Sequence, residues 1–280
     1  MQSVHIVIPC YNEADRLPGD QLLAFLAANP WASVSLVNDG SVDDTMDVLQ
    51  RLRAEAPDQI DVHDLRQNVG KAEAVRCAVL ESLRRPFDFV GYLDADFSTL
   101  PETLGKMLKA AEPRHRFILG SRVLRAGAVI ERSPRRHYLG RVFATLASII
   151  LNLRLYDTQC GAKLIERSLI DPLFAQPFLT RWLFDLELLL RLRALLGDRG
   201  FADCVIEIPL NRWIDQGSSR IRLRDLFAVP YGLMRIRAHY RHALGADVGH
   251  ETPAELRSAS SPTQSPLQPA DEQLHGSTVD

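Results

Sequence analysis

The 280-residue chain has little of three features that would each point to a class of protein. It has four cysteines, which lie far apart without metal-binding spacing, so we expect reduced thiols in a cytoplasmic protein. Its longest apolar run, Val142 to Leu151, is about half of what crossing a bilayer requires. Its net charge is only −2, which by itself indicates no class of partner.

Arginines nevertheless gather in two segments. Eight arginines and one glutamate lie between Pro113 and Arg141, and six arginines and one aspartate lie between Arg220 and Arg241. Such basic segments suit phosphates or an anionic membrane surface, although solvated arginines on helix faces are an open alternative. We expect Leu223 to Ala243 to be a helix that mixes apolar and cationic side chains, as interfacial helices do. The alternative is that its apolar side chains pack on the rest of the protein.

Short apolar runs alternate with helical patterns through the first half of the chain. Strands are expected at Val4 to Ile8, Val34 to Val37, Ile60 to His63 and Phe89 to Leu93, each followed by a polar loop and most by a helix. This pattern predicts an α/β fold with a mostly parallel, Rossmann-like sheet and helices on both faces. We assign residues 1–245 to this domain and expect 246–280, rich in Ser, Pro and Gln, to be a disordered tail.

Two aspartates follow the last of these strands. Asp94 and Asp96 are one residue apart, so strand alternation would point both carboxylates to one side. Two such carboxylates repel each other unless a cation neutralises them, and their hard oxygen ligands favour Mg²⁺ or Mn²⁺. Alternatively, Asp94 caps a turn and Asp96 is solvated. Glu13, Asp39 and Lys71 also follow strand ends, where parallel sheets bind ligands, and this favours the metal site.

Eight motifs run in order from about Val4 to about Arg241: IPCYNEADRL from Ile8, VNDGSVDDT from Val37, NVGKAEAV from Asn68, LDADFS from Leu93, LGSR from Leu119, DTQCGAK from Asp157, WLFDLELL from Trp182 and WIDQGSSR from Trp213. Together they resemble the family-two glycosyltransferases of the GT-A fold. Among these they look most like the polyprenyl-phosphate sugar transferases of the dolichyl-phosphate β-glucosyltransferase type. The resemblance implies a donor-binding half of about 1–122 and an acceptor-side half of about 123–245.

The resemblance implies an inverting, metal-dependent enzyme that moves a hexose, expected to be glucose, from a UDP-sugar to a polyprenyl or dolichyl phosphate. It implies a peripheral enzyme at the cytoplasmic face of an anionic membrane, with no nucleic-acid partner. One alternative is the same fold with a soluble or saccharide acceptor. Another is a non-catalytic nucleotide-sugar-binding protein, although such a protein has no chemical need for two repelling acids at a strand end.

Residues from the first two strand ends are implied to hold the nucleoside. By resemblance Pro9, Tyr11 and Glu13 hold uridine and ribose, and Asp39 binds the uracil ring. A carboxylate that accepts from uracil N3–H is chemically sensible, and Gly40 allows the backbone to come close. The alternative for Asp39 is a turn or helix-capping role.

The diphosphate side of the implied site has five further residues. By resemblance Asp96 is the direct metal ligand, and Asp94 binds ribose or the ion through water. Lys71 either reaches a phosphate or covers a helix amino end. Arg122 would bind the diphosphate or the acceptor phosphate, since arginine can pair with phosphate in a bidentate way. Gln159 is expected to contact a sugar hydroxyl.

Two residues are implied for the acceptor side and for closure of the site. Asp185 would be the general base if the acceptor were a sugar hydroxyl, and an organiser of the pocket if it were a lipid phosphate, which is already ionised. An ion-paired acid on the helix surface is the alternative. Arg220, in a late loop that resembles a flap, would bind the diphosphate. The expected catalytic set is therefore Asp94, Asp96, Asp185 and Arg122.

Overall fold

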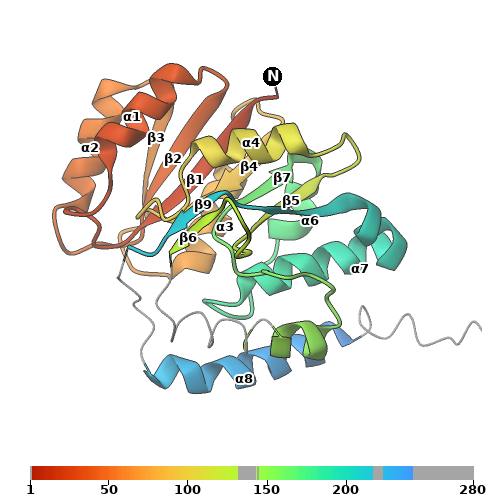
Figure 1. Cartoon of the computed structure of the whole chain (residues 1–280). Helices are drawn as coiled ribbons and strands as arrows, with labels where there is room; N and C mark the ends of the chain where they lie inside the picture. Colours follow the sequence, from red (N-terminus) through yellow and green to blue (C-terminus); the bar gives the residue numbers. More distant parts are fainter. Residues whose placement is uncertain (1, 132–142, 144, 217–222, 242–280) are drawn as a thin grey trace, which may run out of the picture. The chain divides into compact units, whose positions relative to one another are not determined.

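The computed structural model describes residues 2–131, 143, 145–216 and 223–241 (Figure 1). They belong to one compact unit, Met1–Asp247. A second unit, Val248–Asp280, lies outside the described residues. The disordered tail and the domain boundary therefore stay predictions.

A seven-stranded sheet runs through the first unit in the order β3-β2-β1-β4-β7-β5-β8 (Figure 1). Within it only β7 is antiparallel, to both β4 and β5. This confirms the predicted mostly parallel α/β sheet. The strands are β1 (Val4–Cys10), β2 (Ala32–Asn38), β3 (Ile60–Asp64), β4 (Phe89–Tyr92), β5 (Phe117–Ser121), β7 (Lys163–Glu166) and β8 (Val205–Pro209), and a separate pair is formed by β6 (Val129–Glu131) and β9 (Arg212–Ile214).

Helices cover both faces of the sheet, as the alternation of its strand residues requires. On β1, Ile6 and Ile8 join one apolar core and Val7 joins the other, because successive strand residues point to opposite faces. The first core also takes residues from α1, α2 and α4, and the second from α3, α6, α7 and α8. The helices are α1 (Gly19–Ala28), α2 (Thr45–Glu55), α3 (Lys71–Ser82), α4 (Glu102–Ala110), α6 (Ile170–Phe174), α7 (Phe184–Cys204) and α8 (Leu223–His239), with a 3-10 turn η1 (Arg167–Leu169) before α6.

The first strand runs further than expected. β1 continues past Pro9 to Cys10. The last paired residue of β1 on the β4 side is Val7, so beyond it the strand has a neighbour on one side only. A proline without an N–H group is tolerated at such an edge position.

Helix α8 forms where an interfacial helix was expected, but part of its apolar surface is buried. Leu233 and Ile236 of α8 are fully buried in the core that α7 also lines, whereas Tyr231 and Met234 are 72% and 58% exposed. The alternative, that apolar side chains of this helix pack on the rest of the protein, is therefore right for Leu233 and Ile236. Among the described residues, no helix combines the length and the apolar character that a membrane crossing requires.

Candidate active site

Loops that follow β1, β2 and β3 are fastened to one another at the carboxyl edge of the sheet. The backbone N–H groups of Asn12 and Glu13 donate to Ser41 Oγ (3.0 Å) and Thr45 Oγ1 (2.8 Å). The N–H of Asp39 donates to the carbonyl of Cys10 at 2.8 Å, which ties the ends of β1 and β2. The parallel strands thus bring Pro9, Tyr11, Glu13 and Asp39 to one edge, as the sequence predicts.

Asp39 is buried, and its carboxylate holds the turn before α3. It accepts the N–H of Val69 at 2.7 Å and that of Gly70 at 3.0 Å. Burial outweighs these two donors and raises the pKa of Asp39 above its usual value. Gly40 has φ +64°, and a side chain there would meet Gln67 Cα at 2.8 Å. Glycine is therefore required at 40, and Asp39 has the turn-organising role that the sequence left open beside uracil binding.

Asp94 lies between a cation and a glycine. Although enclosure by the protein opposes its charge, an ion pair and hydrogen bond from the Lys71 ammonium hold the pKa of Asp94 below its usual value. Lys71 begins α3, so its side chain reaches from that helix to the end of β4. On the other side, a methyl group at Gly161 would collide with the Asp94 carboxylate. The backbone at 161 thus forms a wall that fixes where this carboxylate can lie.

Asp96 faces a second cation. Its Oδ1 accepts the N–H of Ser98 at 3.0 Å, and its Oδ2 lies 3.8 Å from Arg16 Nη2. The same guanidinium lies 3.3 Å from Glu13 Oε2. Arg16 was not among the residues expected from sequence, although it stands inside the IPCYNEADRL motif.

The acids at the end of β4 suit a hard divalent cation. Within the described ranges, no group of three His, Cys, Asp or Glu residues gathers as a complete metal cage. An ion such as Mg²⁺ needs only one or two protein carboxylates when substrate phosphates and water complete its shell. Oxygen donors from Asp94 and Asp96 fit that requirement.

Arg122 is held in place by an aspartate and an indole ring. Its Nε and Nη2 donate to the two carboxylate oxygens of Asp157 at 2.6 and 2.8 Å, and its backbone N–H donates to the same group at 3.1 Å. Its guanidinium lies 5.3 Å from the centre of the Trp213 ring. The Asp157 carboxylate raises the pKa of Arg122 despite burial, so its charge is secure. Ion pairing to Asp157 was not foreseen, because the two residues are 35 apart in the chain.

Three residues close to Arg122 or Asp157 in the sequence each have a buried polar atom without a hydrogen-bond partner among the described residues. These atoms are Ser121 Oγ, Thr158 Oγ1 and Gln159 Nε2. Ser121 precedes Arg122 at the end of β5, and the other two lie in the turn that follows Asp157. Unpaired buried polar atoms are costly, so their presence in residues close to Arg122 and Asp157 indicates a place for a polar ligand. The contact between Gln159 and a sugar hydroxyl stays a prediction.

Asp185 is almost fully buried at the start of α7. Its Oδ1 accepts a hydrogen bond from the Tyr92 hydroxyl and lies 2.6 Å from the ammonium of Lys163, which is itself fully buried. The alternative of an ion-paired acid on the helix surface is therefore wrong as to the surface and right as to the ion pair, and the role of Asp185 as base or organiser stays a prediction. Lys163 was missed as a site residue, although a lysine within an apolar strand was a visible signal.

One expectation cannot be placed: Arg220 lies outside the described residues, so its contact with a diphosphate stays a prediction.

A second acid of α7 has a structural role. Glu187, two residues after Asp185, is fully buried and accepts from Arg191 (2.8 Å) and from the Tyr240 hydroxyl (3.0 Å). Because Tyr240 follows α8, this acid helps to fasten that helix to α7.

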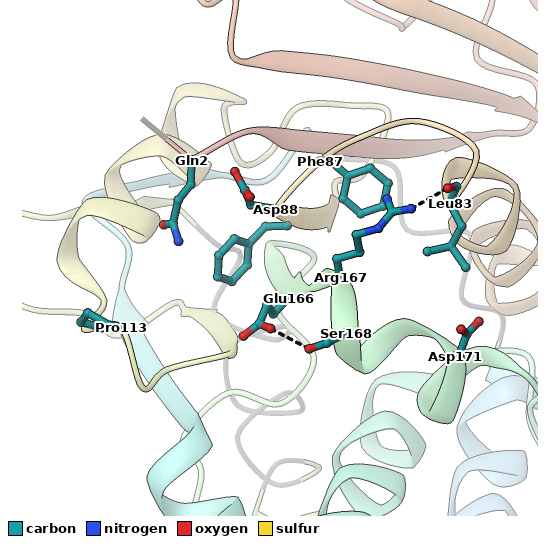
Figure 2. A pocket seen from close by; sticks show the side chains of 10 residues that line it. Gln2, Leu83, Phe87, Asp88, Pro113, Glu166, Arg167, Ser168 and Asp171 are labelled. Carbon is teal, nitrogen blue, oxygen red and sulfur yellow. Dashed lines mark hydrogen bonds between the residues drawn. The ribbon is translucent and has the colours of Figure 1, made fainter.

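A hollow of about 640 Å³ lies at the opposite edge of the sheet, where β1 and β4 begin and β7 ends (Figure 2). Its charged lining is largely paired within the protein. Asp88 accepts from the N–H and hydroxyl of Ser3, and Glu166 pairs with Arg116 at 2.8 Å. Arg167 donates to the carbonyl of Leu83, as Figure 2 shows. The unpaired polar atoms thus favour the carboxyl edge as the active site.

Comparisons with known proteins show the family and the fold. The family described as Glycosyl transferase family 2 matches residues 5–174. A dolichyl-phosphate beta-glucosyltransferase of Trichomonas vaginalis is 30% identical over 253 residues, which cover 85% of this chain and 72% of the relative. The mouse enzyme of that name is 33% identical over 259 residues, covering 85% and 76%. A crystal structure of glucosyl-3-phosphoglycerate synthase from Mycobacterium tuberculosis with Mn²⁺, UDP and glucosyl-3-phosphoglycerate aligns with TM-score 0.59 and 17% identity, over 87% of this chain and 80% of the other.

Proposed function

The chain belongs to glycosyltransferase family 2, and we propose that it transfers a hexose, expected to be glucose, from a UDP-sugar to a polyprenyl or dolichyl phosphate with inversion. One observation carries the proposal: the acids and cations of the motifs converge at the carboxyl edge, in a chain about 30% identical to dolichyl-phosphate beta-glucosyltransferases. Membership of the family makes the protein a glycosyltransferase. The donor, the acceptor and the residue roles are the proposal.

The donor would lie across the ends of β1, β2 and β4. Pro9, Tyr11, Glu13 and Asp39 line the nucleoside end, with Gly40 leaving room for the base. Asp39 would offer uracil a carboxylate whose position is set by the N–H groups of the turn before α3.

Asp94 and Asp96 would hold Mg²⁺ or Mn²⁺, which neutralises negative charge on the leaving nucleoside diphosphate. A solved structure of similar fold contains Mn²⁺ and UDP, which supports this assignment. Lys71, at the start of α3, neutralises Asp94, and Arg16, in the loop after β1, neutralises Asp96. Both cations lie where diphosphate oxygens would arrive, so each can turn from its carboxylate to a phosphate.

The acceptor would approach from the side of Arg122 and Asp185. A phosphate monoester is already ionised, so its oxygen attacks without losing a proton to a base. The chain must instead supply cations, and Arg122 is a fixed, permanently charged one. The engagement of Asp185 with Lys163 and Tyr92 favours this acceptor over a neutral sugar hydroxyl.

A lipid phosphate brings the enzyme to a membrane, and we propose a peripheral attachment at its cytoplasmic face. Tyr231 and Met234 of α8 are exposed, as are Leu146 and Ile149 of the helical residues 145–151. Arg237 of α8 donates to the carbonyl of Ile150, so the two helical segments lie side by side. Apolar and cationic side chains on adjoining helices fit an anionic lipid surface.

The decisive assay measures UDP release from UDP-glucose in Mg²⁺ or Mn²⁺, with polyprenyl phosphate, with a saccharide acceptor and with neither. The proposal requires release that depends on polyprenyl phosphate and a lipid-linked glucose product. Release that depends on the saccharide alone would establish the soluble-acceptor alternative.

Attachment is tested separately by co-sedimentation with anionic liposomes at low and high salt. We expect binding at low salt that Arg235→Glu weakens, because each arginine near the surface contributes about 1 kcal/mol. Arg84→Glu is the matched control, since Arg84 is an exposed arginine in the turn after α3. Equal binding by the two variants would refute attachment through α8.

A further inference from the structure

Lys163 is the most unusual side chain in the described part of the fold. It lies on β7 between β4 and β5, paired at Cα level with Tyr92 and Leu119, and none of it is exposed. An ammonium in such a place is costly unless it is paired and hydrogen-bonded. The structure supplies both, in the carboxylate of Asp185 at 2.6 Å and the carbonyl of Cys160 at 2.6 Å. The ammonium also lies 5.4 Å from the centre of the Tyr92 ring.

The Cys160 carbonyl belongs to the turn 157–161, which is the wall beside Asp94. Gly161, the next residue, has no room for a methyl group against the Asp94 carboxylate. At its other end the turn carries Asp157, which binds Arg122 through two oxygens. A donor that fixes the middle of this turn therefore acts on both a proposed metal ligand and a proposed phosphate ligand.

We propose that Lys163 is a positioning residue that clamps the turn 157–161 against Asp94, and that Asp185 serves as the buried counter-ion of this clamp, not as a general base. The effect on catalysis rests on the proposed function. The ordering of the turn 157–161 rests only on the contacts of Lys163.

The geometry of Asp185 agrees with the role of counter-ion. The same oxygen, Oδ1, receives the Tyr92 hydroxyl and faces the Lys163 ammonium, and the residue is 6% exposed. A general base must come within hydrogen-bond reach of the proton that it removes. Here the carboxylate is directed to groups of β4 and β7 within the core. The acceptor class that this arrangement serves is an anion that needs no deprotonation.

The test compares Lys163→Met/Asp185→Asn, Asp185→Asn and Tyr92→Phe with the wild type. The double variant removes both buried charges together, which avoids leaving one charge unpaired and preserves folding. Hydrogen exchange of the amides of residues 157–162 is measured without ligands. We expect it to be roughly tenfold faster in the double variant, because the Cys160 carbonyl has lost its donor. Tyr92→Phe keeps the contact between Lys163 and Cys160 and should show wild-type exchange in this segment.

Activity provides the second readout. We expect kcat of the double variant to fall roughly 10- to 100-fold, since small misplacements of catalytic groups have effects of that size. Asp185→Asn should lower kcat by no more than the double variant does, and the pH profile of kcat should keep its shape. Loss of activity in Asp185→Asn beyond that, with unchanged exchange, would show that Asp185 acts on the acceptor and would overturn the inference. Wild-type exchange and kcat in the double variant would overturn it as well.

Failure of the proposed function has a different signature. It appears as a wild-type protein without transfer to polyprenyl phosphate, whatever the exchange of residues 157–162. Faster exchange in the double variant would then still establish the clamp.

Discussion

Gly161→Ala is the sharpest test of how the structure places Asp94. The added methyl group would lie 3.0 Å from Asp94 Cγ and closer still to Oδ2, well inside normal contact. The turn cannot easily retreat, because the Lys163 ammonium holds the adjacent carbonyl. The carboxylate therefore has to move, by roughly 1 Å, and a displacement of that size typically costs about 100-fold in rate.

We therefore expect kcat to fall about 100-fold, or about 2.7 kcal/mol in the activation barrier. Affinity for Mn²⁺ in the presence of UDP, measured by calorimetry, should fall in parallel. The matched control is Gly19→Ala, where the methyl group would meet Leu52 Cδ2 at 2.8 Å. That neighbour is the flexible end of a side chain, so the control should keep wild-type kcat. A Gly161→Ala enzyme within threefold of wild-type kcat, with an unchanged melting temperature, would refute the reasoning.

Three further predictions follow from single residues. Asp96→Ala should abolish transfer without lowering the melting temperature, because it removes a proposed metal ligand and no core contact; near-normal turnover in Mg²⁺ or Mn²⁺ would disprove the assignment. Asp39→Ala should raise the donor KM more than it lowers kcat, and should lower the melting temperature, since the turn before α3 loses its acceptor; a pure kcat defect would contradict uracil binding. Burial lowers the pKa of His5 from 6.5 to about 4, so the unfolded chain takes up this proton first. The contribution of neutral His5 to the free energy of unfolding is therefore fully present above pH 6.5 and is lost as the pH falls towards 4. At pH 5 the free energy of unfolding should be lower by about 2 kcal/mol. Urea unfolding of His5→Gln should show a flatter dependence in that range, and an identical slope would remove His5 as the cause.

Local patterns in the sequence were sufficient for the outline of the site. Apolar runs followed by polar loops and helices predict a parallel sheet, and such a sheet brings its carboxyl ends to one edge. The sequence alone therefore places Glu13, Asp39, Lys71 and Asp94 near one another, since each follows a strand or starts the next helix. The structure confirms the sheet and the proximity of Lys71 to Asp94.

Only the tertiary structure decided which charges pair. Tyr92 and Asp185 are 93 residues apart, and Arg122 and Asp157 are 35 apart, and no periodicity in a sequence relates such positions. Their contacts depend on the antiparallel insertion of β7 between β4 and β5. A four-residue strand has the same alternation in either direction, so its place and direction could not be read from its residues. That insertion puts Lys163 next to Tyr92. Because a buried ammonium has to be neutralised, Asp185 becomes the partner of Lys163.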